Sequence, residues 1–472
     1  MDAMKIGLLK IILSLIFLLS AQYTFSQATD PHISGTVQVS MKDGTIKADL
    51  VISNIPTLED YSIWLNTGFT LERLANANEQ VTYAPLREYN AEQYEVFKYE
   101  LKDTKRNAQI FTDKLSLKYT GAFPVLADSK KVEGWCADWK GNIVFIDNTL
   151  RASEQTAWYP IIYDKKNDVL LNKVTYDLEI VSEDTSSIYL NGSSPVKANR
   201  YRFTTATPVP LLLVMGSFEF KARQKINFIN THLPNLAEAT LVEWTNKITQ
   251  FYEQKLDLNY GRSVSYIESR PACNNWGWMF VSYPSIMVVG NEANSLSSYF
   301  DKETHQFKRS SDIGYIAHEL AHYYFGEVFV PNAELKWFFL EGMAEYAALQ
   351  ALHTLVGEEE YHAVIQNYSE EVKAMTFPPL HEITSAEQIN QTYRYRYIPL
   401  LLTALEKEVG TQMTWRWLRE VINSKNTLSN YNFFKETLLK AGISQSALAH
   451  FEDTYVKGEK SLERVIEQAK TR

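Results

Sequence analysis

Cysteine is scarce in this chain: its 472 residues contain only Cys136 and Cys273. Two cysteines cannot build the dense disulfide framework that stabilises many small secreted domains, so a fold of this length must depend on hydrophobic cores. The two residues lie in different predicted domains. The sequence therefore leaves open whether they pair or remain two buried free thiols.

The chain also lacks an excess of positive charge. It has 47 lysine and arginine residues against 56 aspartate and glutamate residues, which gives a formal net charge of −9. Nucleic acids and anionic membranes attract basic surfaces, and no basic run stands out in this sequence. We therefore expect neither as a general partner.

Apolar runs of membrane-spanning length, ~20 residues, are lacking as well. The longest, Ile11–Leu19, follows Lys5 and Lys10 and is itself followed by small residues. This pattern predicts a secretory signal over residues 1–28, whereas an uncleaved anchor would need a longer run. We expect an exported protein, periplasmic or secreted, without membrane association after signal removal.

The remaining sequence predicts an α+β protein of two domains. Residues 29–208 contain short runs with alternating apolar and polar residues, such as Lys173–Ile180, and favour an antiparallel β-sandwich. Residues 209–472 mix strands with long helical patterns, the first over Asn235–Gln254. Strands are expected at Ser263–Ile267, Met279–Ser282 and Ile286–Val289, ahead of further helices.

A metal-binding pattern lies in the second domain, where His318-Glu319-Leu320-Ala321-His322 is followed after eighteen residues by Glu341. Residues four apart share one face of a helix, so both imidazoles can reach one ion. With Glu341 as third ligand, a tetrahedral zinc ion keeps one position open, as catalytic zinc sites do. Two ordinary histidines are the alternative, but the HExxH motif alone arises by chance in only about one such chain in a hundred, and Glu341 lowers that frequency further.

These residues resemble the zinc aminopeptidase family that includes alanyl aminopeptidases and leukotriene hydrolase. The resemblance rests on His318–His322 and on Glu341 within Phe339–Tyr346. It implies a β-sandwich followed by a thermolysin-like, mostly helical zinc metallopeptidase domain with one zinc ion. It also implies a peptide or protein substrate, hydrolysed by zinc-bound water that Glu319 deprotonates.

The resemblance further implies an oxyanion-stabilising tyrosine at the start of a later helix. Tyr395 takes this position ahead of Leu400–Gly410, and Tyr393 is the competing residue. The family's amine-binding Gly-Ala-Met-Glu-Asn segment is missing, and the position of its glutamate falls near Tyr283. An aminopeptidase, a metallo-endopeptidase and a non-catalytic peptide-binding protein with the same fold therefore remain as alternatives.

Overall fold

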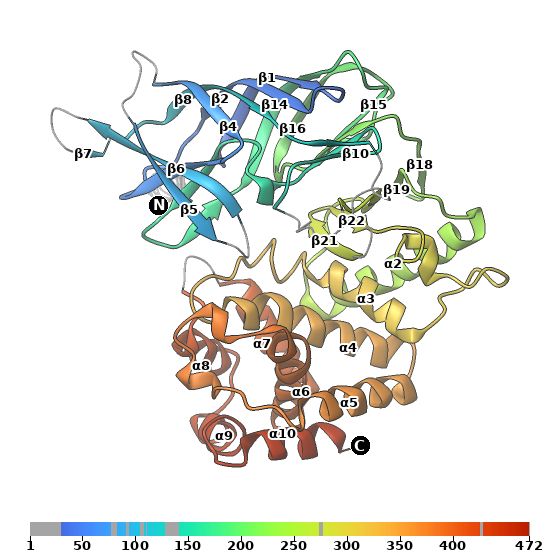
Figure 1. Cartoon of the computed structure of the whole chain (residues 1–472). Coiled ribbons are helices and arrows are strands. Elements are labelled where there is room, and N and C mark those ends of the chain that lie inside the picture. Colours follow the sequence, from blue (N-terminus) through green and yellow to red (C-terminus); the bar gives the residue numbers. More distant parts are fainter. Residues whose placement is uncertain are drawn as a thin grey trace, which may run out of the picture.

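The computed structural model describes residues 30–76, 83–90, 94–103, 108–109, 111–127, 141–272, 277–424 and 428–471. A β-rich N-terminal part lies beside a C-terminal part in which helices dominate (Figure 1). This agrees with the predicted order of the two domains. The predicted signal and both cysteines lie outside the described residues.

In the N-terminal part, residues 30–216, the described residues form three sheets. The first has the order β16-β14-β1-β2-β8-β4, the second β15-β17-β11-β10-β9, and the third β13-β12-β3-β6-β5 with β7 paired to β6. The strands are β1 (His32–Ser40), β2 (Thr45–Ser53), β3 (Tyr61–Asn66), β4 (Phe69–Ala75), β5 (Tyr83–Asn90), β6 (Tyr94–Asp103), β7 (Ala108–Gln109), β8 (Lys114–Ala122), β9 (Val125–Leu126), β10 (Val144–Ile146), β11 (Thr149–Ala152), β12 (Ile161–Asp164), β13 (Val169–Leu171), β14 (Lys173–Val181), β15 (Ser187–Leu190), β16 (Arg200–Pro210) and β17 (Leu213–Gly216).

The alternation seen in the sequence corresponds to burial in the structure. In β14 every second side chain is buried and the others are partly exposed, as expected where a sheet has one covered face. The sheets are not purely antiparallel, however, because β1 and β14 pair in parallel, with His32 opposite Thr175. A hairpin can join only antiparallel strands, and parallel strands need a long connection. β1 and β14 meet this condition, because they lie far apart in the sequence.

A fourth sheet, with the order β18-β19-β20-β22-β21, opens the C-terminal part. Its strand β21 is antiparallel to β22 and forms one edge. Its strands are β18 (Phe220–Arg223), β19 (Ile226–Ile229), β20 (Ser265–Ser269), β21 (Trp278–Ser282) and β22 (Ser285–Val289). The last three agree with the three predicted strands to within two residues at each end, whereas β18 and β19 were not predicted. The edge strand β21 forms one wall of the cavity described below.

The helices of the C-terminal part pack into one large core with the near side of the fourth sheet. The expected helix over Asn235–Gln254 is α2 (Asn235–Leu256). The others are α3 (Ser310–Ala321), α4 (Met343–Leu355), α5 (Glu358–Val372), α6 (Ile398–Val409), α7 (Thr411–Ile422), α8 (Tyr431–Lys440), α9 (Gln445–Phe451) and α10 (Ser461–Lys470). None of the helices among the described residues is long and apolar enough to cross a membrane.

Two of these helices begin with a π-helical turn that the sequence pattern does not predict. η4 (Phe338–Gly342) leads into α4, and η7 (Tyr393–Tyr397) leads into α6. The sequence predicts one uniform helix over Leu335–Leu352. A π-turn can be told from an α-turn only by a shift in the periodicity of apolar residues. No such shift is visible around η4, because successive residues there are nearly all buried and apolar.

The two parts share a small third core. It contains Tyr189, Leu212 and Val214 from the N-terminal part and Ile267 and Met287 from the fourth sheet. The predicted boundary at residue 208 falls within β16, and β17 still pairs with β11 and β15. The position of the domain boundary stays a prediction.

Gly342 allows the helix η4–α4 to pack closely against α6. A Cβ atom added at Gly342 would overlap the buried side chain of Ile398. We expect Gly342→Ala to lower the free energy of unfolding by about 1–3 kcal/mol, the usual cost of overpacking a core. Urea denaturation measures this change.

Gly314 in α3 supplies the matched control, since an added Cβ there meets no atom within 4 Å. Gly314→Ala should leave stability unchanged or raise it by up to ~1 kcal/mol, because alanine favours helix more than glycine does. Equal stability of the two variants would contradict the close packing of Gly342.

Candidate metal centre

Helix α3 carries the first part of the centre. Its buried face includes Ile313, Ile316 and Leu320, which belong to the large core of the C-terminal part. At its start, Arg309 donates a hydrogen bond of 2.6 Å to Asp312, whose carboxylate lies in the first turn. A negative charge at this end stabilises the helix dipole. The core contacts and this ion pair hold α3 in place up to the turn that carries the histidines.

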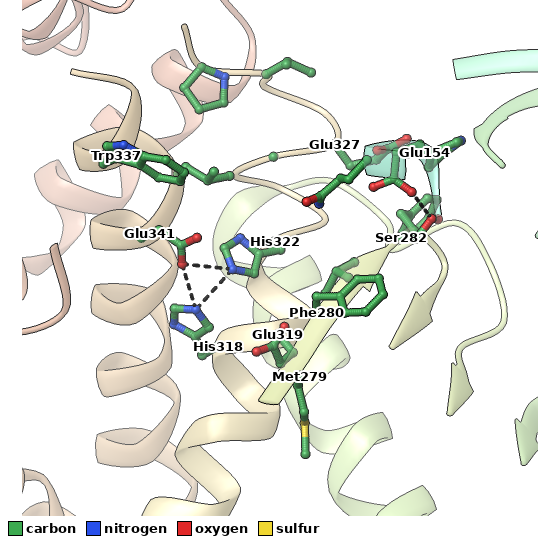
Figure 2. Close-up of a pocket in the computed structure, with 18 of the residues that line it drawn as sticks. Glu154, Met279, Phe280, Ser282, His318, Glu319, His322, Glu327, Trp337 and Glu341 are labelled. Atoms are coloured by element: carbon green, nitrogen blue, oxygen red, sulfur yellow. Dashed lines mark hydrogen bonds and ion pairs between the residues drawn. The ribbon is translucent and has the colours of Figure 1, made fainter. Parts of the chain in front are cut away.

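His318 lies in the last turn of α3, and His322 follows directly after its end at Ala321. The backbone of His322 remains helical (φ −61°, ψ −17°), so both rings project from the same side. Glu341 comes from η4 on the neighbouring helix. Figure 2 shows the two rings and the Glu341 carboxylate meeting at one point.

The three side chains have the spacing of a metal site. One ligand atom from each lies within 4.8 Å of the other two. Nε2 of His318 is 3.1 Å from Nε2 of His322, and the two nitrogens lie 3.3 Å and 3.4 Å from Oε2 of Glu341. All three residues are largely buried. Two imidazoles and one carboxylate are the donor set of catalytic zinc sites, so the predicted ligands fit a zinc ion.

Electrostatics favour a cation at this point. Burial alone would raise the pKa of Glu341, but the two histidines outweigh it and hold that pKa well below its usual value. Burial would likewise lower the pKa of His318, yet Glu341 and Glu345 raise it well above the usual value. The carboxylates thus stabilise positive charge on the imidazoles, and a divalent ion supplies that charge instead.

Glu345 supports the centre from behind. Its Oε2 lies 2.7 Å from Nδ1 of His318, the ring nitrogen on the far side from Glu341, and its carboxylate also accepts a hydrogen bond from Tyr368. His322 has its own partner, since its Nδ1 is 3.2 Å from the carbonyl oxygen of Phe325. Such partners orient metal-binding imidazoles and fix which nitrogen faces the ion.

The centre forms part of the wall of a cavity of about 420 Å³. Glu319 lines it directly beside the histidines (Figure 2). The facing wall is the edge strand β21, of which Trp278–Ser282 all reach the cavity. The geometry places a potential general base, a metal position and an open binding space next to one another.

Of the two tyrosines considered from the sequence, Tyr395 lines this cavity. Its ring centroid lies 5.8 Å from that of His318. Burial, followed by the nearby Glu341 carboxylate, raises the pKa of Tyr395 far above its usual value, so its hydroxyl stays protonated and can donate. Tyr393 is fully buried elsewhere, where its hydroxyl donates to the carbonyl of Pro378 at 3.1 Å.

Comparison with solved structures identifies the fold. Native leukotriene A4 hydrolase from yeast superposes with a TM-score of 0.64 at 13% identity, covering 91% of this chain and 68% of that one. A mutant M1 zinc metallopeptidase from Deinococcus radiodurans gives 0.60 at 15%, covering 90% and 94%. The same metallopeptidase with a Tyr-Ser-Ala substrate gives 0.55 at 15%, covering 93% and 94%.

This chain has the M1 zinc metallopeptidase fold. The resemblance stated from the sequence is confirmed at that level, and the expected zinc is consistent with both the fold and the His-His-Glu group. No family model and no curated protein matches the sequence itself. The similarity is thus recognisable in three dimensions and in a short motif, but not along the sequence as a whole.

Several residues around the candidate metal centre were not predicted from the sequence. Glu345 had a usable signal, because it follows Glu341 by four residues on the same helix. Glu154 and Glu327 also line the cavity, at the end opposite Trp337 (Figure 2). They had no such signal, since they come from distant segments that only the fold brings together.

We expect Glu345→Ala to weaken zinc binding by about 10- to 100-fold, because His318 loses the carboxylate that orients its ring. Competition with a chelator of known affinity measures the effect on purified protein. Glu370→Ala on α5 is the control, since Glu370 is half exposed and its partners are Lys373, Lys470 and Gln366, none of which touches the metal centre. Unchanged zinc affinity in Glu345→Ala would mean that Glu345 does not support the ligand.

Proposed function

We propose that this protein is a zinc-dependent metallopeptidase that hydrolyses peptide bonds. The observation that carries the proposal is the convergence of His318, His322 and Glu341 in the wall of a cavity, with Glu319 beside them. The M1 fold supports it, as does the peptide substrate bound in a structural neighbour. The signal-like residues 1–28 support export to the periplasm or the medium.

In the proposed reaction, His318, His322 and Glu341 hold the metal and leave one position open toward the cavity. When bound, zinc lowers the pKa of water and polarises the carbonyl of the substrate. Glu319 accepts the proton of the attacking water and then gives it to the departing amine. Its place in the cavity wall, beside His318, is suited to both transfers.

Tyr395 supplies a second group in this proposal. Attack on a carbonyl places negative charge on its oxygen, and a fixed hydroxyl that donates to that oxygen stabilises the transition state. Because burial keeps Tyr395 protonated, its hydroxyl acts as a hydrogen-bond donor over the whole physiological pH range. Tyr395 lies in η7, with its ring centroid 5.8 Å from that of His318.

Glu319→Gln tests the proposed function. The change keeps the size of the side chain but removes the base, so turnover should fall by several orders of magnitude while zinc stays bound. The readout is digestion of a mixed peptide library followed by mass spectrometry, together with zinc content. Absence of cleavage by the zinc-loaded wild type, or near-normal cleavage by Glu319→Gln, would refute this mechanism.

Tyr395→Phe should lower kcat by roughly 100-fold or more, the usual size of losing one oxyanion donor, with zinc content unchanged. KM should change little, because the lost hydrogen bond forms mainly in the transition state. Tyr393→Phe is the matched control two residues away, and its kcat should stay near that of the wild type. The reverse pattern would assign the role to Tyr393 instead.

A further inference from the structure

A second cavity, of about 560 Å³, lies where the N-terminal part meets the fourth sheet. Ser194, which follows β15, lines one side of it, whereas Asn227 on β19 and Ser265 on β20 line the other. Adjacent residues of the turn between β21 and β22 reach different cavities, Tyr283 the metal cavity and Pro284 the second one. The two cavities share no described lining residue, and the proposed hydrolysis does not use the second.

The charged residues of the second cavity are both cations. Lys225, in the turn between β18 and β19, and Arg262, ahead of β20, line it, and its described lining contains no aspartate or glutamate. Four glutamates, in contrast, line the metal cavity. The whole chain has a net charge of −9, so this basic cavity is a local exception. Two like charges beside one space repel each other and attract an anion.

Arg262 has donors left for a ligand. Its guanidinium donates to the backbone carbonyls of Gly192 and Thr207, at 3.4 Å and 3.2 Å, and it has five N–H donors in all. It forms no ion pair with a carboxylate in the part of the chain that the structure describes. Burial raises the pKa of Glu327 to about 7, and Arg262 opposes this rise only weakly. The ion pair of Glu327 is with Lys173 on β14, at 3.4 Å.

Lys225 and two hydroxyls are also available to a ligand. The Lys225 ammonium has neither an ion pair nor a hydrogen bond with any described residue, and its side chain is exposed. The hydroxyls of Ser194 and Ser263, both exposed, likewise have no partner among these residues. Deeper in the cavity, the side-chain amide of Asn227 donates to the hydroxyl of the buried Ser265 at 3.0 Å. Hydrogen-bond donors of three kinds thus face one space.

A phosphate group matches this set of donors. A phosphate monoester carries about 1.5 to 2 negative charges at pH 7 and has three strong acceptor oxygens, so it can meet both cations and the hydroxyls together. Arginine binds phosphate through paired N–H donors, and lysine binds it as a point charge. A carboxylate has a single charge and two oxygens, and would leave part of this set without a partner.

We propose that the second cavity binds a phosphate group through Arg262 and Lys225, either as inorganic phosphate or as the phosphate monoester of a small polar molecule. Its volume of about 560 Å³ is in the usual range for small-molecule sites, so an ester has room. Because Ser194 belongs to the N-terminal part and Arg262 to the C-terminal part, the ligand would also link the two parts. This inference does not depend on the proposed hydrolysis.

Isothermal titration calorimetry of the zinc-loaded protein with inorganic phosphate, at low ionic strength, tests the inference. We expect one phosphate to bind per chain. Arg262→Gln and Lys225→Gln should each weaken binding about 10- to 100-fold, the range for losing a hydrogen bond to a charged group. Lys225→Gln removes no contact between described residues, so it keeps the test valid even if Arg262→Gln fails to fold.

Lys302→Gln is the matched control, because Lys302 is exposed and does not line the second cavity. It changes the net charge equally and should keep the wild-type affinity. A parallel titration with glycerol 3-phosphate distinguishes the two sources of the group. Tighter binding of this ester than of inorganic phosphate would identify an organic phosphate as the ligand, and the reverse order would identify the free ion.

Absence of binding of both phosphate compounds at millimolar concentration would overturn the inference. Undiminished binding by Lys225→Gln and by folded Arg262→Gln would do so as well. Phosphate could also bind to the zinc ion, and binding that survives in both variants but disappears with a chelator would place it there instead. Acetate that binds as tightly as phosphate would overturn the assignment to a phosphate group.

Discussion

The packing of α3 against the helix η4–α4 is the constraint on which the rest of the site depends. It brings two imidazoles and a carboxylate within 4.8 Å in a place that water hardly reaches. The pKa values of His318 and Glu341 are shifted strongly, because little solvent screens the charges around them. Glu345, Tyr395 and the cavity wall all take their positions relative to this pair of helices, so a shift of either would displace several functional groups at once.

The N-terminal part contributes to the cavity as well as to the fold. Glu154 and Lys173 come from it, and the side-chain amide of Asn191 donates to the carbonyls of Ser282 and Tyr283 at 2.9 Å and 2.7 Å. These bonds fix the end of the edge strand β21 to the N-terminal part. Together with the small shared core, they explain why the candidate metal centre in the C-terminal part can depend on the position of the N-terminal part.

Local sequence patterns predicted what depends on local structure. The four-residue spacing of His318 and His322 fixed a shared helix face, and the alternation in β14 fixed a half-buried strand. Glu341 was predicted as the third ligand from its place eighteen residues after His322, and the family resemblance implied the same residue. Glu154 and Glu327 were beyond reach, since they are brought together by contacts between segments more than 150 residues apart in a chain of 472 residues.

Glu341 and Tyr395 both lie in π-helical turns, each just ahead of a regular helix. A π-turn holds one residue more than an α-turn over the same span, and such turns are frequent at functional sites. Loss of one residue would restore a regular helix and rotate the residues on one side of the deletion by about 100° relative to those on the other. The positions of Glu341 and Tyr395 therefore depend on the number of residues in each of the two π-turns. Deleting one residue from either turn would be more damaging than most substitutions.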